Sequence, residues 1–211
     1  MLFLVGQPIL FIMITSAKFT TPKLPTHSDA LKIAQQIAGK ATPVINIYSL
    51  NHNSGKWIRN VKEGDGRRGP WLSANYEVLD KQVWLRREPC LYIVTDVSNS
   101  LCYVGISRNR LRDRWRESPA YDADTLQKLP KNQLFHSQCW KFIEEESLAN
   151  PQSTYQVRCI SGKELLDALP EIWQLFSCLV NSSDDEEGIV AFIERWMCYR
   201  NLVRWNVAMT G

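Results

Sequence analysis

The sequence has no C-x-x-C pair and no cysteine–histidine cluster with zinc-ligand spacing, although it contains six cysteines and three histidines in 211 residues. The common structural zinc sites are therefore excluded. The cysteines are scattered, mostly inside apolar runs where a thiol packs as a small hydrophobic group; they are Cys90, Cys102, Cys139, Cys159, Cys178 and Cys198. Three disulfides are the alternative, but a chain of this size does not need them. We expect reduced thiols and a cytoplasmic protein.

No apolar run reaches the ~20 residues that a membrane-spanning helix needs. The first 14 residues are almost wholly apolar, but the first basic residue, Lys18, follows them. A secretory signal begins with positive charge instead. We expect residues 1–25 to be a disordered tail, or a mis-started segment if translation begins at Met13. A weak export signal or a small membrane anchor is the alternative, and we expect no membrane partner.

Internal repeats, low-complexity tracts and a strong charge imbalance are also missing. The chain is 45% hydrophobic and 22% charged, which is typical of a packed globular protein. Its length suits one domain and an accessory segment. The net charge of +3 neither requires nor excludes a polyanionic partner.

Residues 26–85 are expected to form an accessory region. Ser28 begins a short helix that ends at Gly39, and residues 43–50 have the β-branched and aromatic content of a strand. Residues 51–70 form a long loop that carries the basic residues Arg59, Lys62, Arg67 and Arg68. The basic part of this loop, residues 55–69, is a candidate contact for a nucleic-acid backbone, and a solvated surface loop is at least as good an interpretation.

Residues 86–211 are expected to form one α+β domain around an antiparallel hairpin. Residues 90–97 and 101–106 are rich in Val, Ile, Tyr and Cys and flank a short turn, which predicts two paired strands. Further elements are expected as helices at 108–118, 133–150 and 188–202, a strand at 154–160 and an inserted helical pair at about 161–185. Ser161 and Glu164 have the spacing of a capping box. The result is a small antiparallel sheet in β-β-α-α-β-α order, with a helical insertion and an N-terminal extension.

Two tyrosines and an arginine of this domain are candidate catalytic residues. Tyr92 and Tyr103 lie on the two hairpin strands with ten residues between them, although tyrosine also favours strands for purely structural reasons. Arg114 lies beside Leu111 and Trp115, which have the spacing of a buried helical stripe. Its aliphatic stem can therefore follow the edge of the core. A solvated basic helix is the alternative to a guanidinium directed at a phosphate.

Glu194 is a carboxylate on the apolar side of a predicted helix. Val190, Ile193 and Met197 lie at −4, −1 and +3 from it on the same helical face. A buried carboxylate without a partner is energetically expensive. We therefore expect Arg114 or a cation beside Glu194, unless the face assignment is wrong and the side chain is exposed.

These residue types fit the hydrolysis of a phosphodiester. Magnesium prefers one or two carboxylates with several waters retained, and a metal on Glu194 would polarise the phosphate. Arginine can hold the charge that develops on the phosphorus centre. A tyrosine hydroxyl can orient or deprotonate water once nearby cations lower its pKa.

The same segment resembles the GIY-YIG nuclease superfamily. Its first motif is Cys-Leu-Tyr at 90–92 and its second is Tyr-Val-Gly at 103–105, with the ten-residue gap typical of the family. In the helix that follows, the family places a leucine three residues before the catalytic arginine, as Leu111 precedes Arg114. The element order resembles that of the family as well.

The closing motif of the family, a helical glutamate followed twelve residues later by an asparagine, is similar to Glu194 and Asn206. The resemblance implies an active site formed by Tyr92, Tyr103, Arg114, Glu194 and Asn206. It implies that Glu194 is the ligand of Mg²⁺ or Mn²⁺ and that Asn206 supports the hairpin. Members of the family differ in which tyrosine acts as the base, and here Tyr92 is slightly preferred.

The sequence departs from the family pattern at three places. Cys90 stands where the first motif has glycine, and Ile106 stands where a lysine is usual, so Arg108 is expected to supply the phosphate contact. The helix is one residue longer than usual, which leaves Arg110 and Arg112 as alternatives for the catalytic arginine. All three arginines are expected to contact nucleic acid.

The resemblance implies a divalent-metal-dependent endonuclease that acts on DNA, with RNA as an alternative and a homodimer as an open possibility. Because five residues follow Asn206, we expect specificity to come from residues 26–85 or from the insertion. A restriction-like or mobile-element role fits such a chain by analogy. The alternatives are a non-catalytic nucleic-acid-binding module of the same fold and a nuclease toxin.

Overall fold

The structure is a computed structural model of the chain, and it describes residues 25–52, 57–59, 67–69, 72–115, 120–122, 125, 127, 139–170 and 185–205. The expectations for residues 1–24, for Lys62, Cys178 and Asn206, and for the middle of the predicted insertion lie outside these described residues. Within the described part, no helix is both long enough and apolar enough to cross a membrane.

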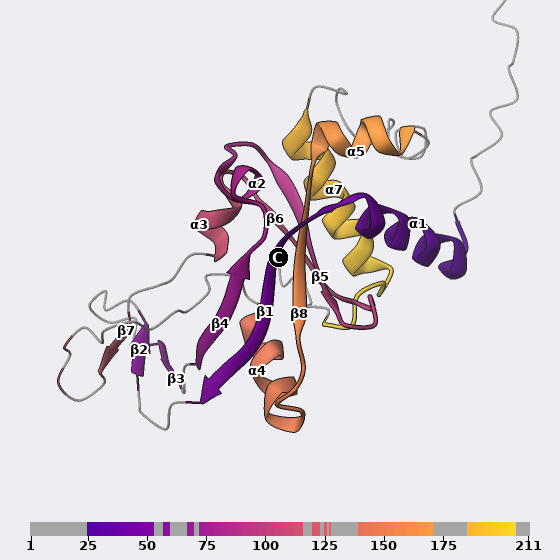
Figure 1. Cartoon of the computed structure of the whole chain (residues 1–211). Helices are drawn as coiled ribbons and strands as arrows, with labels where there is room; N and C mark the ends of the chain where they lie inside the picture. The colour runs from indigo at the N-terminus through magenta and orange to yellow at the C-terminus, as the bar shows by residue number, and fades with distance from the viewer. Residues whose placement is uncertain are drawn as a thin grey trace, which may run out of the picture.

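A five-stranded antiparallel sheet organises the molecule (Figure 1). The strands lie in the order β4-β1-β8-β5-β6, so β8 is central, β5 lies between β8 and β6, and β6 is at an edge. They are β1 (Thr42–His52), β4 (Leu72–Val78), β5 (Cys90–Asp96), β6 (Leu101–Ser107) and β8 (Tyr155–Ser161). A second, three-stranded sheet has the order β3-β2-β7. Its strands are β2 (Trp57–Arg59), β3 (Arg67–Gly69) and β7 (Ala120–Asp122).

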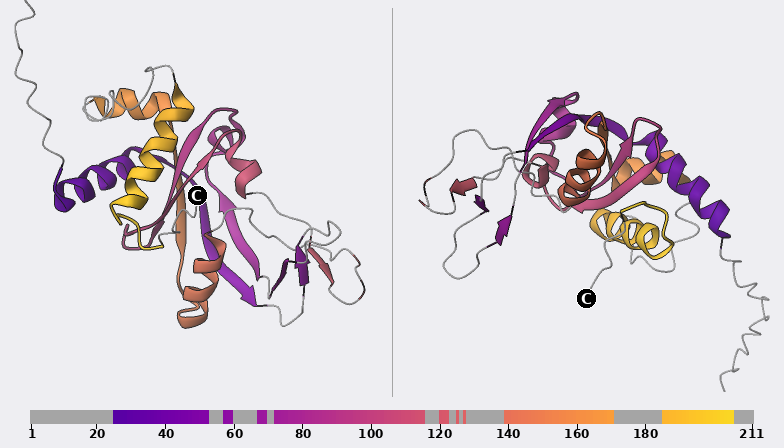
Figure 2. Two further views of the ribbon diagram at one scale, coloured as in Figure 1. Left: turned by 180° about the vertical axis from the view of Figure 1, so that it is seen from behind. Right: turned by 90° about the horizontal axis from the view of Figure 1, so that it is seen from below.

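Helices pack on both faces of the larger sheet (Figure 2). They are α1 (His27–Lys40), α2 (Lys81–Leu85), α3 (Leu111–Trp115), α4 (Trp140–Ala149), α5 (Gly162–Ala168) and α7 (Glu186–Tyr199). Side chains alternate between the two faces along a strand. Leu91 and Ile93 of β5 accordingly join the hydrophobic cluster of α1, α5 and α7, whereas Tyr92 and Val94 join that of α2, α3 and α4.

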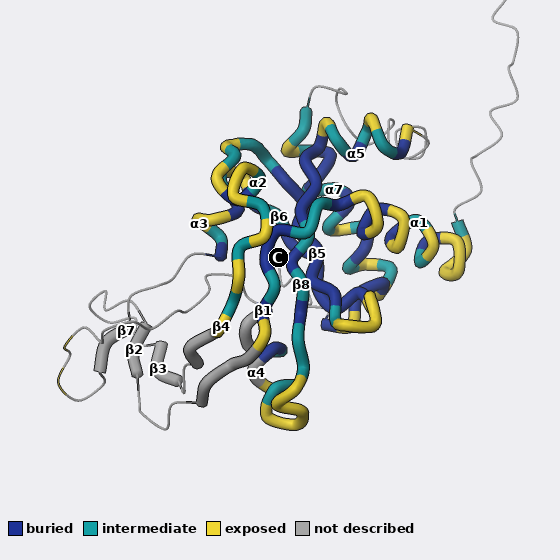
Figure 3. Tube along the Cα trace, in the orientation of Figure 1, coloured by how far each residue is buried: buried dark blue, intermediate teal, exposed yellow. Residues whose placement is uncertain are grey.

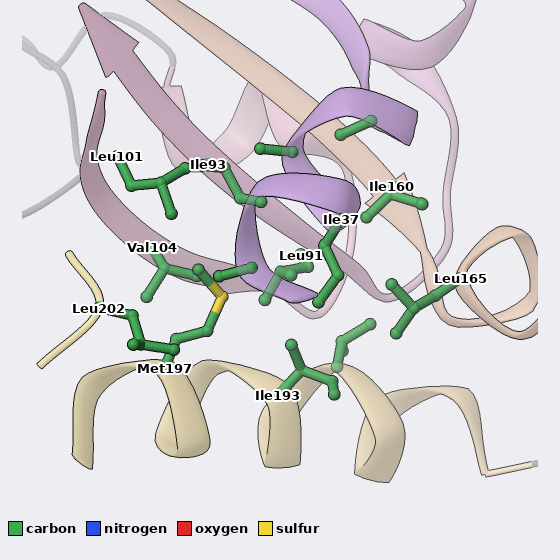
Figure 4. Close-up of a cluster of buried hydrophobic side chains, with 14 of the residues drawn as sticks. Ile37, Leu91, Ile93, Leu101, Val104, Ile160, Leu165, Ile193, Met197 and Leu202 are labelled. Atoms are coloured by element: carbon green, nitrogen blue, oxygen red, sulfur yellow. The ribbon is translucent and has the colours of Figure 1, made fainter. Parts of the chain in front are cut away.

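The buried residues concentrate on the hairpin and on the helices that face it. Figure 3 shows buried residues along most of β5 and β6, while β4 alternates between intermediate and exposed residues. In Figure 4, Ile193 and Met197 of α7 point toward Leu91 and Val104 of the hairpin. The apolar face predicted for this helix is thereby confirmed, because Val190, Ile193 and Met197 are all buried.

Capping boxes begin two helices, and an aspartate side chain shapes the hairpin turn. The capping box of Ser161 and Glu164 is present at α5, as predicted. α1 begins one residue earlier than predicted, because Thr26 is its N-cap and forms a capping box with Asp29. In the turn between β5 and β6, the Asp96 carboxylate accepts hydrogen bonds from the backbone N–H groups of Ser98 and Ser100.

The predicted α+β class and the antiparallel hairpin are confirmed, but the larger sheet has more strands than expected. The strand predicted at 43–50 is β1, and it pairs with β8 and with β4. β4 was not predicted, and neither was α2. Two short strands, β2 and β3, lie within the segment 51–70 that was predicted to be a loop. The strand and helix predicted at 154–160 and 188–202 are β8 and α7.

Candidate active site

Tyr92 and Tyr103 stack on each other on the sheet face that is covered by α2, α3 and α4. Their ring centroids are 6.1 Å apart and their planes differ by 24°. The regular part of the β5–β6 register sets this arrangement, since Tyr92 pairs with Gly105 and Val94 pairs with Tyr103. Paired residues lie on the same face of a sheet, as do residues two apart along a strand, so Tyr103 is on the same face as Tyr92. Both tyrosines are buried, whereas the structural interpretation of these residues had them half-buried.

Gly105 provides the space for the Tyr92 hydroxyl group. It pairs directly with Tyr92 across the hairpin. A Cβ atom at residue 105 would overlap the Tyr92 hydroxyl oxygen and would lie only 2.5 Å from Tyr92 Cζ and 3.0 Å from Tyr103 Cε1. The glycine of the second motif is therefore a packing requirement of the two phenols.

Arg114 reaches the tyrosines from α3. Leu111 and Trp115 are both buried, as predicted, and fix this short helix against the sheet. The Trp115 ring meets Tyr92 edge-on with centroids 5.6 Å apart. Arg114 Nε donates a hydrogen bond to the Tyr92 hydroxyl oxygen over 3.4 Å. Burial lowers the pKa of Arg114, but its interactions with Tyr92, Tyr103 and Glu194 raise that pKa by more, so the guanidinium stays charged.

Glu194 of α7, which packs on the opposite face of the sheet, interacts electrostatically with Arg114 and Tyr103. Because β6 is the edge strand, a side chain of α7 can reach around it. The backbone of Ile106 in β6 hydrogen-bonds the Glu194 carboxylate. Burial raises the pKa of Glu194 and exceeds the opposing attraction of Arg114, Arg195 and Arg108. The same carboxylate contributes to raising the pKa of Tyr103, although burial contributes more.

Four of the five predicted active-site residues are thus brought together from four separate elements. They are Tyr92 of β5, Tyr103 of β6, Arg114 of α3 and Glu194 of α7. The fifth, Asn206, lies outside the described residues. The preceding residue, Trp205, donates its backbone N–H to the carbonyl of Cys102 in β6 over 2.7 Å.

Comparisons of the chain with protein-family models, with curated proteins and with solved structures found no match.

A metal ion at this site would have one carboxylate ligand from the described residues. In that part of the chain, no three His, Cys, Asp or Glu side chains gather as a metal-binding group. Mg²⁺ accepts one or two carboxylates and keeps several of its waters. The half-buried Glu194, whose charge burial disfavours, fits such a ligand because a bound cation would stabilise the ionised carboxylate.

The other arginines of the predicted nucleic-acid surface lie in different surroundings. Arg108 forms an exposed ion pair with Glu187 of α7, with Nε 2.5 Å from Oε1. Arg110 pairs through its backbone with Arg87 and is half-buried. Arg112 is exposed. Arg108 and Arg110 precede α3. Among these described arginines Arg114 is the one that hydrogen-bonds Tyr92, so the geometry favours it over Arg110 and Arg112.

The basic residues of the segment 51–70 lie outside the five-stranded sheet. Arg59 is in β2, and Arg67 and Arg68 are in β3, where Arg59 pairs with Arg67. The segment is therefore a small sheet in part and not wholly a loop, because β2 also pairs with β7. Lys62 lies outside the described residues.

Sequence reasoning missed three contributors to the site. Gly105 was noted as part of a motif but not as the space that Tyr92 needs. Arg195 adjoins Glu194 and lowers its pKa; its position next to the carboxylate was the available signal. Glu187 lies seven residues before Glu194 and therefore on the same side of α7, where it engages Arg108.

Proposed function

We propose that this chain is a divalent-metal-dependent nuclease of the GIY-YIG type that hydrolyses phosphodiester bonds. The observation that carries the proposal is the convergence of Tyr92, Tyr103, Arg114 and Glu194. Two phenols, a guanidinium and a carboxylate are a costly combination to bury without a function, because partly desolvated polar groups destabilise a core.

The arrangement of the surrounding elements supports the same family. The hairpin β5–β6 pairs with β8 through β5, and α3, α4 and α7 follow in the sequence as the family resemblance implies. The short strand β7 and the helix α5 are additional to that order. β1 and β4 extend the sheet beyond β8.

Each residue has a defined part in the proposed reaction. Arg114 remains protonated and is placed to hold a phosphate oxygen as negative charge develops. Glu194 would hold Mg²⁺ or Mn²⁺, which would act as a Lewis acid on the phosphate. The arginines around Glu194 are Arg108, Arg114 and Arg195, and together they favour an anionic substrate.

Tyr92 is the preferred residue to orient or deprotonate the attacking water. Its hydroxyl oxygen accepts a hydrogen bond from Arg114, whose positive charge favours a phenolate. Tyr103 is less suited because, among the described residues, it accepts no such hydrogen bond from Arg114, while burial raises its pKa, with Tyr92 as the next contributor. We infer that Tyr103 positions the substrate or the water.

DNA is the proposed substrate. RNA is the alternative, and a comparison of plasmid and RNA cleavage distinguishes the two. Arg108 would leave Glu187 to contact a phosphate, since an exposed ion pair is worth little in water. Arg59, Arg67 and Arg68 of the small sheet, Lys62, Arg110 and Arg112 remain proposed backbone contacts. A homodimer remains a proposal for cutting both strands of a duplex.

The test is plasmid and RNA cleavage by purified full-length protein in Mg²⁺, in Mn²⁺ and in EDTA. We expect metal-dependent nicking that is lost in Glu194→Gln, with thermal unfolding showing an intact fold. Glu145→Gln is the matched control, because Glu145 is an exposed glutamate on α4. Discrete products would indicate sequence specificity, and a smear would indicate a non-specific nuclease or toxin. Tight binding of both nucleic acids without cleavage would identify a non-catalytic module and overturn the proposal.

A further inference from the structure

Part of the sheet face opposite the tyrosines carries polar side chains and no helix among the described residues. α1, α5 and α7 pack over β5, β6 and the end of β8, and their cluster includes no residue of β1 or β4. The uncovered part presents Asn46 and Tyr48 of β1, Glu77 of β4, and Gln156 and Arg158 of β8. These side chains lie on the face opposite Val44, Ile47 and Val157.

Two cavities lie along this face and meet at the hairpin. The first has a volume of about 220 Å³ and is lined by Asn46, Tyr48, Thr95, Asn99 and Gln156, among others. The second has a volume of about 420 Å³, between α1 and the hairpin turn, and is lined by Gln35, Gly39, Thr95, Asn99 and Arg158, among others. Thr95 and Asn99 line both. We call the two cavities together the polar groove.

Thr95 gives the polar groove an unused hydrogen-bonding group. Thr95 as a whole is only 2% exposed. Among the described residues, its Oγ1 atom is buried and has no hydrogen-bond partner. A buried hydroxyl without a partner is unfavourable, and such groups are rare in native proteins. A ligand in the cavities that Thr95 lines would satisfy it.

Tyr48 gives the polar groove a fixed aromatic ring at the surface. Its side chain is exposed, yet its hydroxyl donates to Glu77 Oε2 over 2.6 Å and accepts from Asn46 Nδ2 over 3.3 Å. Gln156 Nε2 in turn donates to Asn46 Oδ1 over 3.0 Å. An exposed ring that is held in one orientation loses little entropy when a flat group stacks on it.

The charged groups of the polar groove have hydrogen-bond partners within the fold. Arg158 donates from Nε to the carbonyl of Ala41 and from Nη1 to Gln156 Oε1, which fixes its guanidinium. Asp96 accepts from two backbone N–H groups and from Arg204 Nη1. The groove therefore offers amides, one hydroxyl, one ring and the N–H groups that Arg158 does not use in these bonds. This chemistry fits a flat group with hydrogen-bonding edges.

We propose that the polar groove binds an unpaired base of a nucleic-acid strand. The base would stack on Tyr48 and be read by the amides and by the Thr95 hydroxyl. The choice of a base over a sugar ring rests on the proposed nuclease function. The groove lies on the opposite sheet face from Tyr92 and Tyr103, so it would hold an unpaired segment of the substrate away from the scissile phosphate.

The test measures binding of labelled 12-nucleotide single strands of DNA and RNA to the full-length protein in EDTA, where no cleavage is expected. A DNA strand of equal length that is abasic throughout is the comparison, since it keeps the backbone charge and the sugars. We expect wild type to bind the abasic strand at least tenfold more weakly. Tyr48→Ala should weaken binding of the intact strand by about 5- to 100-fold, the range for one base stack.

Thr95→Val removes the hydroxyl while it keeps the shape of the side chain. We expect about three- to tenfold weaker binding of the intact strand, the value of one hydrogen bond. Its melting temperature should be equal to or higher than that of wild type, because an unpartnered buried hydroxyl is gone. A group needed only for folding would give the opposite shift in melting temperature. Tyr199→Ala, which removes a tyrosine that is 88% exposed on α7, is the matched control.

Failure of this inference differs from failure of the nuclease proposal. Equal binding of the abasic and intact strands, or unchanged binding in Tyr48→Ala and Thr95→Val, overturns the proposal that the polar groove binds a base, even if the protein cuts plasmid. Selective loss of base binding in these two variants supports the groove even if no cleavage is found. A preference for the DNA or the RNA strand identifies the source of the base.

Discussion

The Nε group of Arg114 donates its hydrogen bond to the hydroxyl oxygen of Tyr92, over 3.4 Å. This contact joins a helix that follows the hairpin to β5, an interior strand of the sheet. It places a permanent positive charge beside a buried phenol. At 3.4 Å it is longer than the usual ~2.9–3.0 Å of an N–H···O bond, so a substrate oxygen can compete for the guanidinium.

Replacement of Arg114 tests its role in holding charge. Arg114→Ala and Arg114→Lys should each lower the cleavage rate by about 10²–10³-fold, because a compact ammonium cannot offer two parallel hydrogen bonds. The measurement is single-turnover cleavage of an end-labelled duplex. Arg87→Ala, which removes an exposed arginine outside the proposed nucleic-acid contacts, should cleave within a few-fold of wild type. Equal losses in both alanine variants would show a general effect of basic charge.

The two tyrosines should differ in their contribution to the rate. Tyr92→Phe should lower single-turnover cleavage by about 10²–10⁴-fold, the range for general acid–base catalysis. Tyr103→Phe should lower it less, because among the described residues Tyr103 accepts no hydrogen bond from Arg114 that would favour its phenolate. Cleavage rates across pH 6 to 10 provide the comparison. A larger loss of cleavage in Tyr103→Phe would identify Tyr103 as the base and Tyr92 as the positioning residue.

Gly105→Ala should destabilise the protein by about 1–3 kcal/mol, as overpacking of a core does. The added methyl group would collide with Tyr92 and Tyr103, so the two phenols must move and cleavage should fall as well. Urea unfolding measures the first effect. Gly39→Ala is the control: nothing lies within 4 Å of a Cβ at that helical position, and alanine is expected to stabilise α1 by up to ~1 kcal/mol.

Glu194 should make the stability of the metal-free protein depend on pH. Burial, the largest cause, raises the pKa of Glu194 above its value in the unfolded chain. Ionisation of Glu194 therefore opposes folding. This destabilisation begins as pH rises through the pKa of a glutamate in the unfolded chain, about 4.3, and it is complete above the pKa of Glu194 in the folded protein.

In EDTA at neutral pH, Glu194→Gln should consequently melt above wild type, and the difference should vanish as pH falls below about 4. Mg²⁺ or Mn²⁺ should raise the melting temperature of wild type and not that of the variant, because only the carboxylate binds the cation. Thermal unfolding across pH, with and without metal, gives both results. A variant that melts below wild type in EDTA would show that the ionised carboxylate stabilises the fold.

Glu146 should anchor the segment that follows α7. Its carboxylate accepts hydrogen bonds from Trp205 Nε1 over 2.8 Å, Tyr155 Oη over 2.8 Å and Arg204 Nη2 over 2.9 Å. Glu146→Ala would leave three donors without their acceptor and should destabilise the protein by about 1–3 kcal/mol. Denaturant unfolding is the measurement. Glu145→Ala on the exposed side of α4 should change the stability by less than about 0.5 kcal/mol.

Local signals in the sequence predicted much of the fold around the site. The hairpin followed from two β-branched and aromatic runs, and the start of α5 followed from Ser161 and Glu164. The buried stripe of Leu111 and Trp115 followed from helical spacing. These features depend on interactions within a few residues, so short sequence windows contain them.

The residue types of the candidate site could also be predicted from the sequence, but the choice among the three arginines could not. The spacing of Leu111 left three arginines as alternatives, and only the packing of Trp115 against Tyr92 shows which of them faces the phenols. Likewise, the ion pair of Arg108 with Glu187 joins residues 79 positions apart. A local sequence pattern cannot predict a contact between residues so far apart in the chain.

What the sequence determined by itself is the set of chemical groups and the short-range periodicities that form each helix and strand. The tertiary structure alone decided that β1 and β4 join β8 in one sheet, that β6 is an edge around which Glu194 can reach, and that Thr95 lies between two cavities. The physical reason is that strand pairing depends on contacts between distant segments. Their free energy depends on the packing of the whole core and not on the residues beside them in the chain.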